Sequence, residues 1–216
     1  GRTDTGVHGV AQVVHFDDPA GRSQKAWVMG CNSNLPSTVR VLWAKSVPSD
    51  FHARFSAVSR HYRYVISNSA IQSPHHAGLV SHCRKPLDAQ AMHDASQALL
   101  GEHDFSAFRA AQCQATHPIR EILGVRVKRV ENFVILDIEA NAFLYHMVRN
   151  LVGSLQMVGL GLRSREWIAE LLSGKDRTLG GDTAGPSGLY LQSITYPERF
   201  GLPVHQALNS LLLGGG

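Results

Sequence analysis

The sequence lacks the features that mark membrane and secreted proteins. It has no run of about 18 or more apolar residues, the length that a transmembrane helix requires. The longest apolar stretch, "AFLYHMVRNLVGSLQMVGLGL", is interrupted by His146, Arg149 and Asn150. The N-terminus has no basic segment followed by an apolar one, so nothing indicates secretion. We therefore expect a cytoplasmic protein that makes no contact with a membrane.

Cysteine is scarce, and the three residues, Cys31, Cys83 and Cys113, lie far apart. Their odd number and wide spacing exclude a disulfide framework and a paired-cysteine metal site, and suit the reducing cytosol. The 12 histidines form no H-E-x-x-H motif, and the His75–His76 pair lies in a predicted loop. A metal hydrolase built on histidines would lose activity with a chelator, and we expect no metal.

Motifs for other cofactors are absent as well. There is no G-x-S-x-G, no P-loop and no dinucleotide fingerprint, so we expect no cofactor. What the chain does have is an ordinary globular composition, with 44% hydrophobic and 18% charged residues over 216 positions. The net charge of +4 and the excess of arginine over lysine permit a polyanionic partner. Genomic base composition can produce the same arginine bias.

Alternating and β-branched segments predict strands over 11–16, 37–47 and 60–67. The stretch 125–140 predicts a hairpin that turns at Glu131–Asn132. In the strand 60–67, alternation places Tyr62, Tyr64 and Ile66 on one face. In the second strand of the hairpin, it places Val134, Leu136 and Ile138 on one face.

Helical patterns cover 88–101 with Asp88 as N-cap, 142–160, and 164–174 with Ser164 as N-cap. Strands and helices alternate without the long crossovers that a parallel sheet needs. The fold class is therefore α+β with largely antiparallel pairing, and its length fits two sandwiches of that kind. A domain boundary is expected in the polar, proline-containing stretch 46–59.

Asp4 lies in the opening "GRTDTGVHG", between two glycines and two residues after Arg2. In an extended segment Arg2 and Asp4 project to the same side and can form an ion pair. The flanking glycines allow a positive φ or a close approach of the backbone to another group. The structural alternative is a turn whose carboxylate caps nearby amides.

Arg149 lies on the predicted helix 142–160, nearly opposite the apolar arc of Met147, Val148, Leu151, Leu155 and Val158. A solvated arginine on the polar face of the helix is the simpler interpretation. Gly153, one turn along, favours the other interpretation, because a glycine beside an arginine leaves room for another chain or a ligand.

The strand 60–67 presents Tyr62 and Tyr64 on one face, and His61 and Arg63 on the other. Such tyrosines are usually half-buried packing residues. Interleaved with Arg54, Arg60 and Arg63, they can also form a stacking and phosphate-binding surface for RNA.

With these residues in view, the sequence resembles the TruA family of tRNA pseudouridine synthases. The opening stretch is similar to the family's catalytic motif G-R-T-D-A-G-V-H-A/G. The resemblance continues in the family's order through "NLP" (34–36), "FHARFSAVSRHYRYVI" (51–66), "LLGEHDFSAFR" (99–109), "ANAFLYHMVRNLVGSL" (140–155) and "GLYL" (188–191).

The resemblance implies that Asp4 is the catalytic aspartate and Arg149 its partner. It implies that Tyr62 packs on the target base, that Arg2 contacts RNA and helps to hold the flipped nucleotide, and that Leu189 closes the pocket from below. The expected activity is the isomerisation of uridine to pseudouridine at positions 38–40 of the tRNA anticodon arm, by a homodimer.

The family's fold is two ferredoxin-like halves whose antiparallel sheets join, with helices flanking the sheet. It implies that 1–49 are the remainder of the N-terminal half, that 192–216 return to that half, and that 50–191 form the C-terminal half. The family's first fifty or so residues, with Y-D-G and G-W-Q motifs, have no counterpart, so we expect an N-terminally truncated chain and an incomplete N-terminal half. Were the polypeptide to begin here, an exposed sheet edge and poor solubility would follow.

The expected reaction breaks the N1–C1′ bond, turns the base and joins C5 to C1′, so it needs no redox cofactor. It needs a carboxylate that stays ionised where water is excluded, and a guanidinium within about 4–6 Å favours that charged form. The aspartate can act as a nucleophile or as a base toward C2′. Thr5 in place of alanine and the loosened "GPSGLYL" (185–191) depart from the family pattern. A non-catalytic tRNA-binding module, inactivated by truncation, is the alternative function.

Overall fold

The computed structural model describes residues 3–203. Its helices and strands follow one another in the order β1 (His8–Gly9), α1 (Gln24–Asn34), β2 (Ser59–Ser67), β3 (Ser81–His82), α2 (Ala89–Ser96), β4 (Gly101–Asp104), β5 (Ile119–Val130), β6 (Phe133–Ala140), α3 (Met147–Gly159), α4 (Trp167–Gly174) and β7 (Leu189–Thr195). Within 3–203, none of the helices is both long and apolar enough to cross a membrane.

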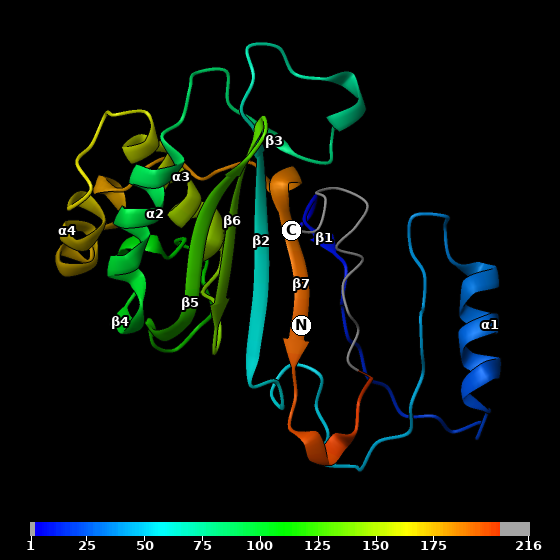
Figure 1. Cartoon of the computed structure of the whole chain (residues 1–216). Coiled ribbons are helices and arrows are strands. Elements are labelled where there is room, and N and C mark those ends of the chain that lie inside the picture. Colours follow the sequence, from blue (N-terminus) through cyan, green and yellow to red (C-terminus); the bar gives the residue numbers. More distant parts are fainter. Residues whose placement is uncertain (1–2, 204–216) are drawn as a thin grey trace.

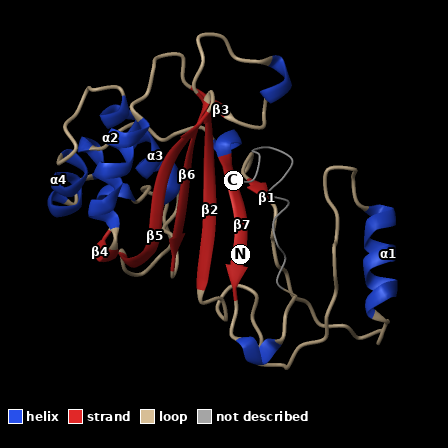
Figure 2. Ribbon diagram, viewed as in Figure 1, coloured by secondary structure: helices blue, strands red, loops and turns tan. Residues whose placement is uncertain are grey.

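One sheet runs through the molecule in the order β1-β7-β2-β6-β5-β4, with β3 paired to the end of β2 (Figures 1 and 2). The long pairs β2–β6, β5–β6, β4–β5 and β2–β7 are antiparallel. The two short pairs β1–β7 and β2–β3 are parallel. The predicted α+β class with largely antiparallel pairing is confirmed, and so is the hairpin at Glu131, which has a positive φ of 50°.

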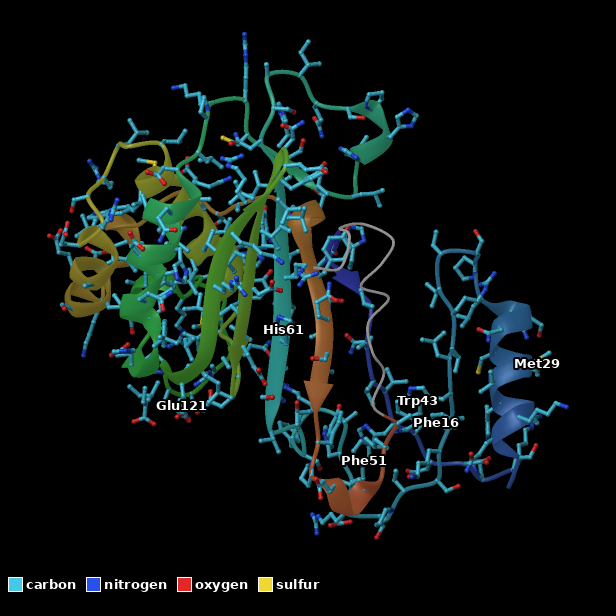
Figure 3. All side chains as sticks on the ribbon, viewed as in Figure 1. Phe16, Met29, Trp43, Phe51, His61 and Glu121 are labelled. Atoms are coloured by element: carbon cyan, nitrogen blue, oxygen red, sulfur yellow. The ribbon has the colours of Figure 1, made fainter. Side chains whose placement is uncertain are left out.

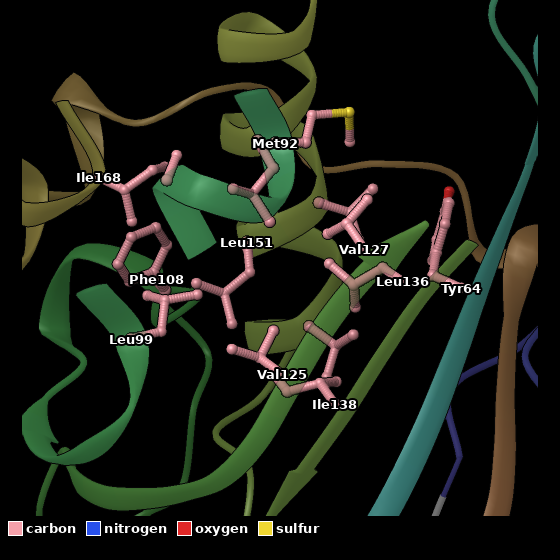
Figure 4. Close-up of a cluster of buried hydrophobic side chains, with 14 of the residues drawn as sticks. Tyr64, Met92, Leu99, Phe108, Val125, Val127, Leu136, Ile138, Leu151 and Ile168 are labelled. Atoms are coloured by element: carbon pink, nitrogen blue, oxygen red, sulfur yellow. The ribbon is translucent and has the colours of Figure 1, made fainter. Parts of the chain in front are cut away.

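Helices α2, α3 and α4 cover one face of the sheet, and the main hydrophobic core lies between these layers (Figure 4). Alternate residues of a strand point to the same face, and in β6 the side chains of Val134, Leu136 and Ile138 lie in the core. Asp137, between two of them, lies on the opposite face and pairs with Arg63. Helix α3 contributes Leu151 and Leu155, whose side chains are fully buried. This packing fixes α3 against the sheet.

The two N-terminal strands predicted over 11–16 and 37–47 are wrong. Within the described residues neither segment forms a regular strand, and α1 between them stands away from the sheet (Figure 1). A strand needs a neighbour for its backbone hydrogen bonds, and alternation alone does not supply one. The segment 37–47 is instead held against α1 by two hydrogen bonds. The side-chain amide of Asn32 donates to the Val41 carbonyl and accepts from the Val41 amide, both at 2.8 Å.

Helix boundaries also differ from the predictions. Helix α3 begins at Met147 rather than at 142, because His146 takes the left-handed conformation (φ 58°) and stops the helix there. Glu166, not Ser164, is the N-cap of α4. Asp88 caps α2 as predicted, its carboxylate accepting from the amide of Ala91. The division into 1–49, 50–191 and 192–216 stays a prediction, and 204–216 lie outside the described residues.

Candidate active site

A tight turn holds Asp4 at the edge of the sheet. The Val7 amide donates to the Asp4 carbonyl at 3.0 Å, and Gly6 within this turn has a φ of +81°. A positive φ of this size favours glycine, so the prediction from the flanking glycine is confirmed. Next to the turn, β1 pairs with β7, and His8 stacks on the ring of Tyr190 with centroids 4.4 Å apart. The sheet therefore fixes the position of Asp4.

The carboxylate of Asp4 faces the start of α3 rather than the amides of its own turn. Its Oδ2 lies 3.8 Å from a terminal nitrogen of Arg149 and 3.4 Å from Nε2 of His146. The Arg149 side chain is 14% exposed and that of Asp4 30%. The solvated-arginine interpretation is therefore wrong, and the sequence-distant acid and guanidinium lie at ion-pair distance.

A backbone segment anchors Arg149 from the other side. Its Nε donates to the Ala184 carbonyl at 2.7 Å, and the Ala184 amide donates back to the Arg149 carbonyl at 3.1 Å. Gly153 makes this contact possible, because a Cβ at that position would lie 1.7 Å from the carbonyl oxygen of Asp182. The sequence predicted that Gly153 leaves room for another chain or a ligand, and the occupant is this segment of the same chain.

Buried polar groups of α3 hold the same segment in register. The side chain of Asn150 accepts from the hydroxyl of Thr183 at 2.6 Å and donates to the Phe108 carbonyl at 2.8 Å. The Ser154 hydroxyl accepts from the Gly181 amide at 3.1 Å. A buried polar group is costly unless it is hydrogen-bonded, and each of these groups is satisfied. Arg149 is consequently held by a preorganised frame.

Asp4 and Arg149 open onto a cleft of about 950 Å³ that runs over β2 and β7 beside the start of α3. Tyr62 and Leu189 both line it. The Tyr62 ring packs edge-on against Phe143, with centroids 5.2 Å apart. Burial, with a further contribution from Asp4 that Arg60 opposes, raises the pKa of Tyr62 to about 12. The Tyr62 hydroxyl is therefore protonated at neutral pH.

The predicted RNA-binding face of β2 is only partly correct. Tyr64 is fully buried, and its hydroxyl donates to the Gly185 carbonyl at 2.7 Å. Arg63 points to the opposite face of the sheet, where it makes two hydrogen bonds to Asp137. Arg54 and Arg60 do line the cleft. Strand alternation separated Arg63 from the cleft, and the depth of the core removed Tyr64 from the surface.

Charge in the cleft is mostly positive. Arg54, Arg60, Arg120 and Arg149 line it, and within 3–203 Asp4 is its single carboxylate. A concave surface with this balance suits a polyanion. The described part of the chain holds no group of three or more histidine, cysteine, aspartate or glutamate side chains arranged to bind a metal. Arg2, the remaining predicted site residue, lies outside the described residues.

Sequence reasoning missed His146 as a site residue. In the sequence His146 stands out only as a polar interruption of the apolar stretch, and the helical pattern predicts that it lies inside the helix 142–160. In the structure His146 instead precedes α3 in the left-handed conformation and turns its ring toward Asp4. Burial and the neighbouring Arg149 lower the pKa of His146 below its ordinary value of 6.5, while Asp4 opposes this shift. The shift therefore favours the neutral form of His146 at pH 7.

The fold and this site define an α+β protein with an acid and a guanidinium facing each other across a basic cleft. A family model described as "tRNA pseudouridine synthase" matches residues 95–197. The tRNA pseudouridine synthase A of Idiomarina loihiensis is 54% identical over 94% of this chain and 78% of its own length. That of Histophilus somni is 54% identical over 99% of this chain and 79% of its own length, and that of an Enterobacter species is 53% identical. The chain belongs to the TruA family of tRNA pseudouridine synthases.

Proposed function

We propose that this protein isomerises uridine to pseudouridine in the anticodon arm of tRNA, at positions 38–40, with Asp4 as the catalytic group. The observation that carries the proposal is the meeting of Asp4 and Arg149 at 3.8 Å in a basic cleft. Family membership supports it, because each of the relatives named above is a tRNA pseudouridine synthase A.

The proposed reaction is an isomerisation in which nothing leaves the substrate. The N1–C1′ bond breaks, the base turns within the cleft, and C5 joins C1′ while C5 gives up its proton and N1 gains one. Asp4 acts either as a nucleophile or as a base toward C2′, and both routes require its ionised form. Arg149 supplies the nearby positive charge that favours this form.

Arg149 performs this role from a fixed position. Because the lowered pKa favours the neutral form of His146 at pH 7, the guanidinium is the main positive charge beside Asp4 among the described residues. Its Nε is bonded to the Ala184 carbonyl, so a terminal nitrogen remains directed at the carboxylate. A preorganised charge of this kind needs no rearrangement when the substrate arrives.

Tyr62 and Leu189 form the walls against which the everted base would rest. A phenol whose pKa is about 12 is a poor acceptor for the C5 proton at neutral pH, so we assign Tyr62 a stacking role. The 5% exposed Leu189 lines the same cleft, and we assign it the role of closing the pocket from below. Arg2 completes the proposed site by contacting the RNA.

The proposed partner is the tRNA anticodon arm, and the proposed assembly is a homodimer in which one tRNA touches both subunits. A target atom inside a stacked stem or loop can be reached only by eversion of the nucleotide, at a cost of a few kcal/mol. Recognition of several positions on different tRNAs relies on shape and backbone contacts. The arginines along the cleft suit that mode.

Replacement of the catalytic carboxylate tests the proposal. We expect Asp4→Ala to reduce pseudouridine formation by at least about 10³-fold, as loss of a catalytic group commonly does, while tRNA binding changes little. Tritium release from [5-³H]uridine-labelled tRNA measures turnover, and filter binding measures affinity. The matched control is Asp17→Ala, an exposed aspartate outside the cleft.

Two outcomes would contradict the proposal. Turnover of Asp4→Ala within tenfold of wild type would remove Asp4 from the chemistry. Normal tRNA binding by the wild-type protein, with no pseudouridine formed, would favour the non-catalytic binding module.

A further inference from the structure

Two phenylalanines four residues apart have opposite surroundings. Phe51 is 7% exposed and packs with Phe200 and Tyr196, whereas Phe55 is 73% exposed and lines the cleft that holds Asp4. Leaving a ring of this size in water forfeits the free energy of burying it. An exposed aromatic side chain at the rim of a basic cleft is what proteins that stack nucleobases display.

The turn that carries Phe55 is rigidly built. The imidazole Nδ1 of His52 accepts from the amides of Arg54 and Phe55 at 3.1 and 3.2 Å. The Ser56 hydroxyl accepts from the His52 amide, and the Ser56 amide donates back to the His52 carbonyl, both at 2.9 Å. The backbone that carries the exposed ring is therefore held in place before any ligand arrives, which reduces the entropy lost on binding.

The surroundings of the ring fit a nucleotide. The Arg54 guanidinium lies over Phe55 at 5.3 Å from the ring centroid, and the His52 ring lies 4.3 Å away on a plane tilted by 32°. Arg60 donates to the Arg54 carbonyl and brings a second positive charge to the turn. Nucleobases stack on aromatic rings and on guanidinium planes alike, and the same arginines attract the phosphate.

We infer that Arg54 and Phe55 form a platform on which a nucleobase adjacent to the everted uridine stacks. This rests on the proposed function, because it takes the RNA in the cleft as the occupant. The platform and Asp4 line one continuous cleft, so an RNA chain whose uridine reaches Asp4 passes beside the platform. A stacked neighbour would replace part of the stacking that is lost when the uridine leaves its helix.

The experiment measures the dissociation constant of a short stem-loop RNA that carries the substrate uridine. Two further RNAs have an abasic site at the nucleotide 5′ or 3′ of that uridine. We expect Phe55→Ala to weaken binding of the intact RNA about tenfold, and Phe55→Tyr, which keeps the ring, to bind within about twofold of wild type. One of the two abasic RNAs should weaken wild-type binding to a similar degree, and Phe55→Ala should not weaken it further.

Ile71→Ala is the matched control, because Ile71 is 83% exposed and lies outside the cleft. Circular dichroism verifies that each variant is folded. The inference is overturned if Phe55→Ala binds the intact RNA as tightly as wild type does. It is also overturned if Phe55→Ala weakens the binding of both abasic RNAs by the same factor as it weakens the binding of the intact RNA. A change in oligomeric state without a change in RNA affinity would assign Phe55 to a protein contact and overturn it as well.

A pseudouridine assay on the intact RNA separates this inference from the proposed function. If the wild-type protein forms no pseudouridine, the proposed function fails. If it does, and Phe55→Ala neither binds more weakly nor turns over more slowly at low RNA concentration, only the platform is refuted.

Discussion

The N-terminal arm (residues 10–47) and the body (residues 59–200) are built on different principles. Helix α3 of the body has ten buried residues, whereas α1 of the arm has none. Large apolar side chains in the arm remain exposed, among them Phe16 at 57% and Met29 at 64% (Figure 3). Within the arm, Trp27 Nε1 donates to Asp18 at 2.8 Å, and near its two ends Val13 and Val47 pack against the small cluster of Phe51 and Phe200.

The difference comes from the spacing of apolar residues, since both helices contain them. In α3 they recur at three- and four-residue intervals, so one side faces the core. In α1 they are consecutive, in "AWVM", and therefore spread around the helix. A helix without an apolar face gains little from packing on a sheet, and most helical stability in proteins comes from such packing.

The largest effect that we expect from this comparison is in amide hydrogen exchange. Amides of α1 should exchange at least about 10³-fold faster than those of α3, because local opening requires little free energy where few groups are buried. Mass spectrometry of peptides covering 24–34 and 147–159 measures the two rates in one sample. Equal protection of both helices would mean that the arm and the body unfold together.

Two glycine substitutions sharpen the same comparison. Gly153→Ala should lower the free energy of unfolding by about 3 kcal/mol, the upper range for overpacking, because the new Cβ meets the Asp182 carbonyl. It should also displace Ala184 and so reduce turnover through Arg149. Gly30→Ala in α1, where no atom lies within 4 Å of the new Cβ, should be neutral or stabilising by up to about 1 kcal/mol.

Thermal unfolding and the tritium-release assay measure both variants. A Gly153→Ala protein with wild-type stability and turnover would show that the segment around Asp182 moves aside easily and does not hold Arg149.

The smallest effect that we expect concerns Asp137, which lies on the face of the sheet opposite the main core. Burial raises the pKa of Asp137, but hydrogen bonds from His61 and Arg63 outweigh it, so the pKa is lowered overall. A lowered folded-state pKa means that the carboxylate stabilises the fold above its unfolded pKa of about 3.9, and that this stabilisation is lost as the pH falls through the folded value.

Asp137→Asn should therefore cost about 1 kcal/mol at pH 7 and progressively less below pH 4. Urea unfolding at a series of pH values measures the difference. Asp17→Asn in the exposed arm is the control, and should change stability by less than about 0.5 kcal/mol throughout. A cost for Asp137→Asn that does not shrink in acid would rule out its charge as the cause.

Much of the body could be predicted from the sequence, and little of the arm. The hairpin at Glu131, the faces of β6 and the cap at Asp88 depend on short-range patterns, and all three are confirmed. The prediction for the arm was wrong because the segment 37–47 has strand-like residues but pairs with no strand within residues 3–203. Local propensity decides such a segment only when a partner is available.

In the site, the sequence singled out Asp4, Tyr62, Arg149 and Leu189, and the structure places all four along one cleft. Alternation along the strand had placed Arg63 on the face opposite Tyr62, which the bonds to Asp137 confirm. The sequence did not separate Tyr64 from Tyr62, because the residues of a strand do not show how deep the core lies beneath each position. It also missed the approach of His146 to Asp4, which depends on one left-handed residue before α3.

The sequence by itself determined the family, the elements of the body and the residue types that the chemistry needs, since these follow from motifs and from periodicity along the chain. Only the tertiary structure decided which charges meet. The distance between Asp4 and Arg149 is set by the pairing of β1 with β7 and by the segment that Gly153 admits beside α3. Contacts between residues so far apart in sequence arise from packing, which no local pattern encodes.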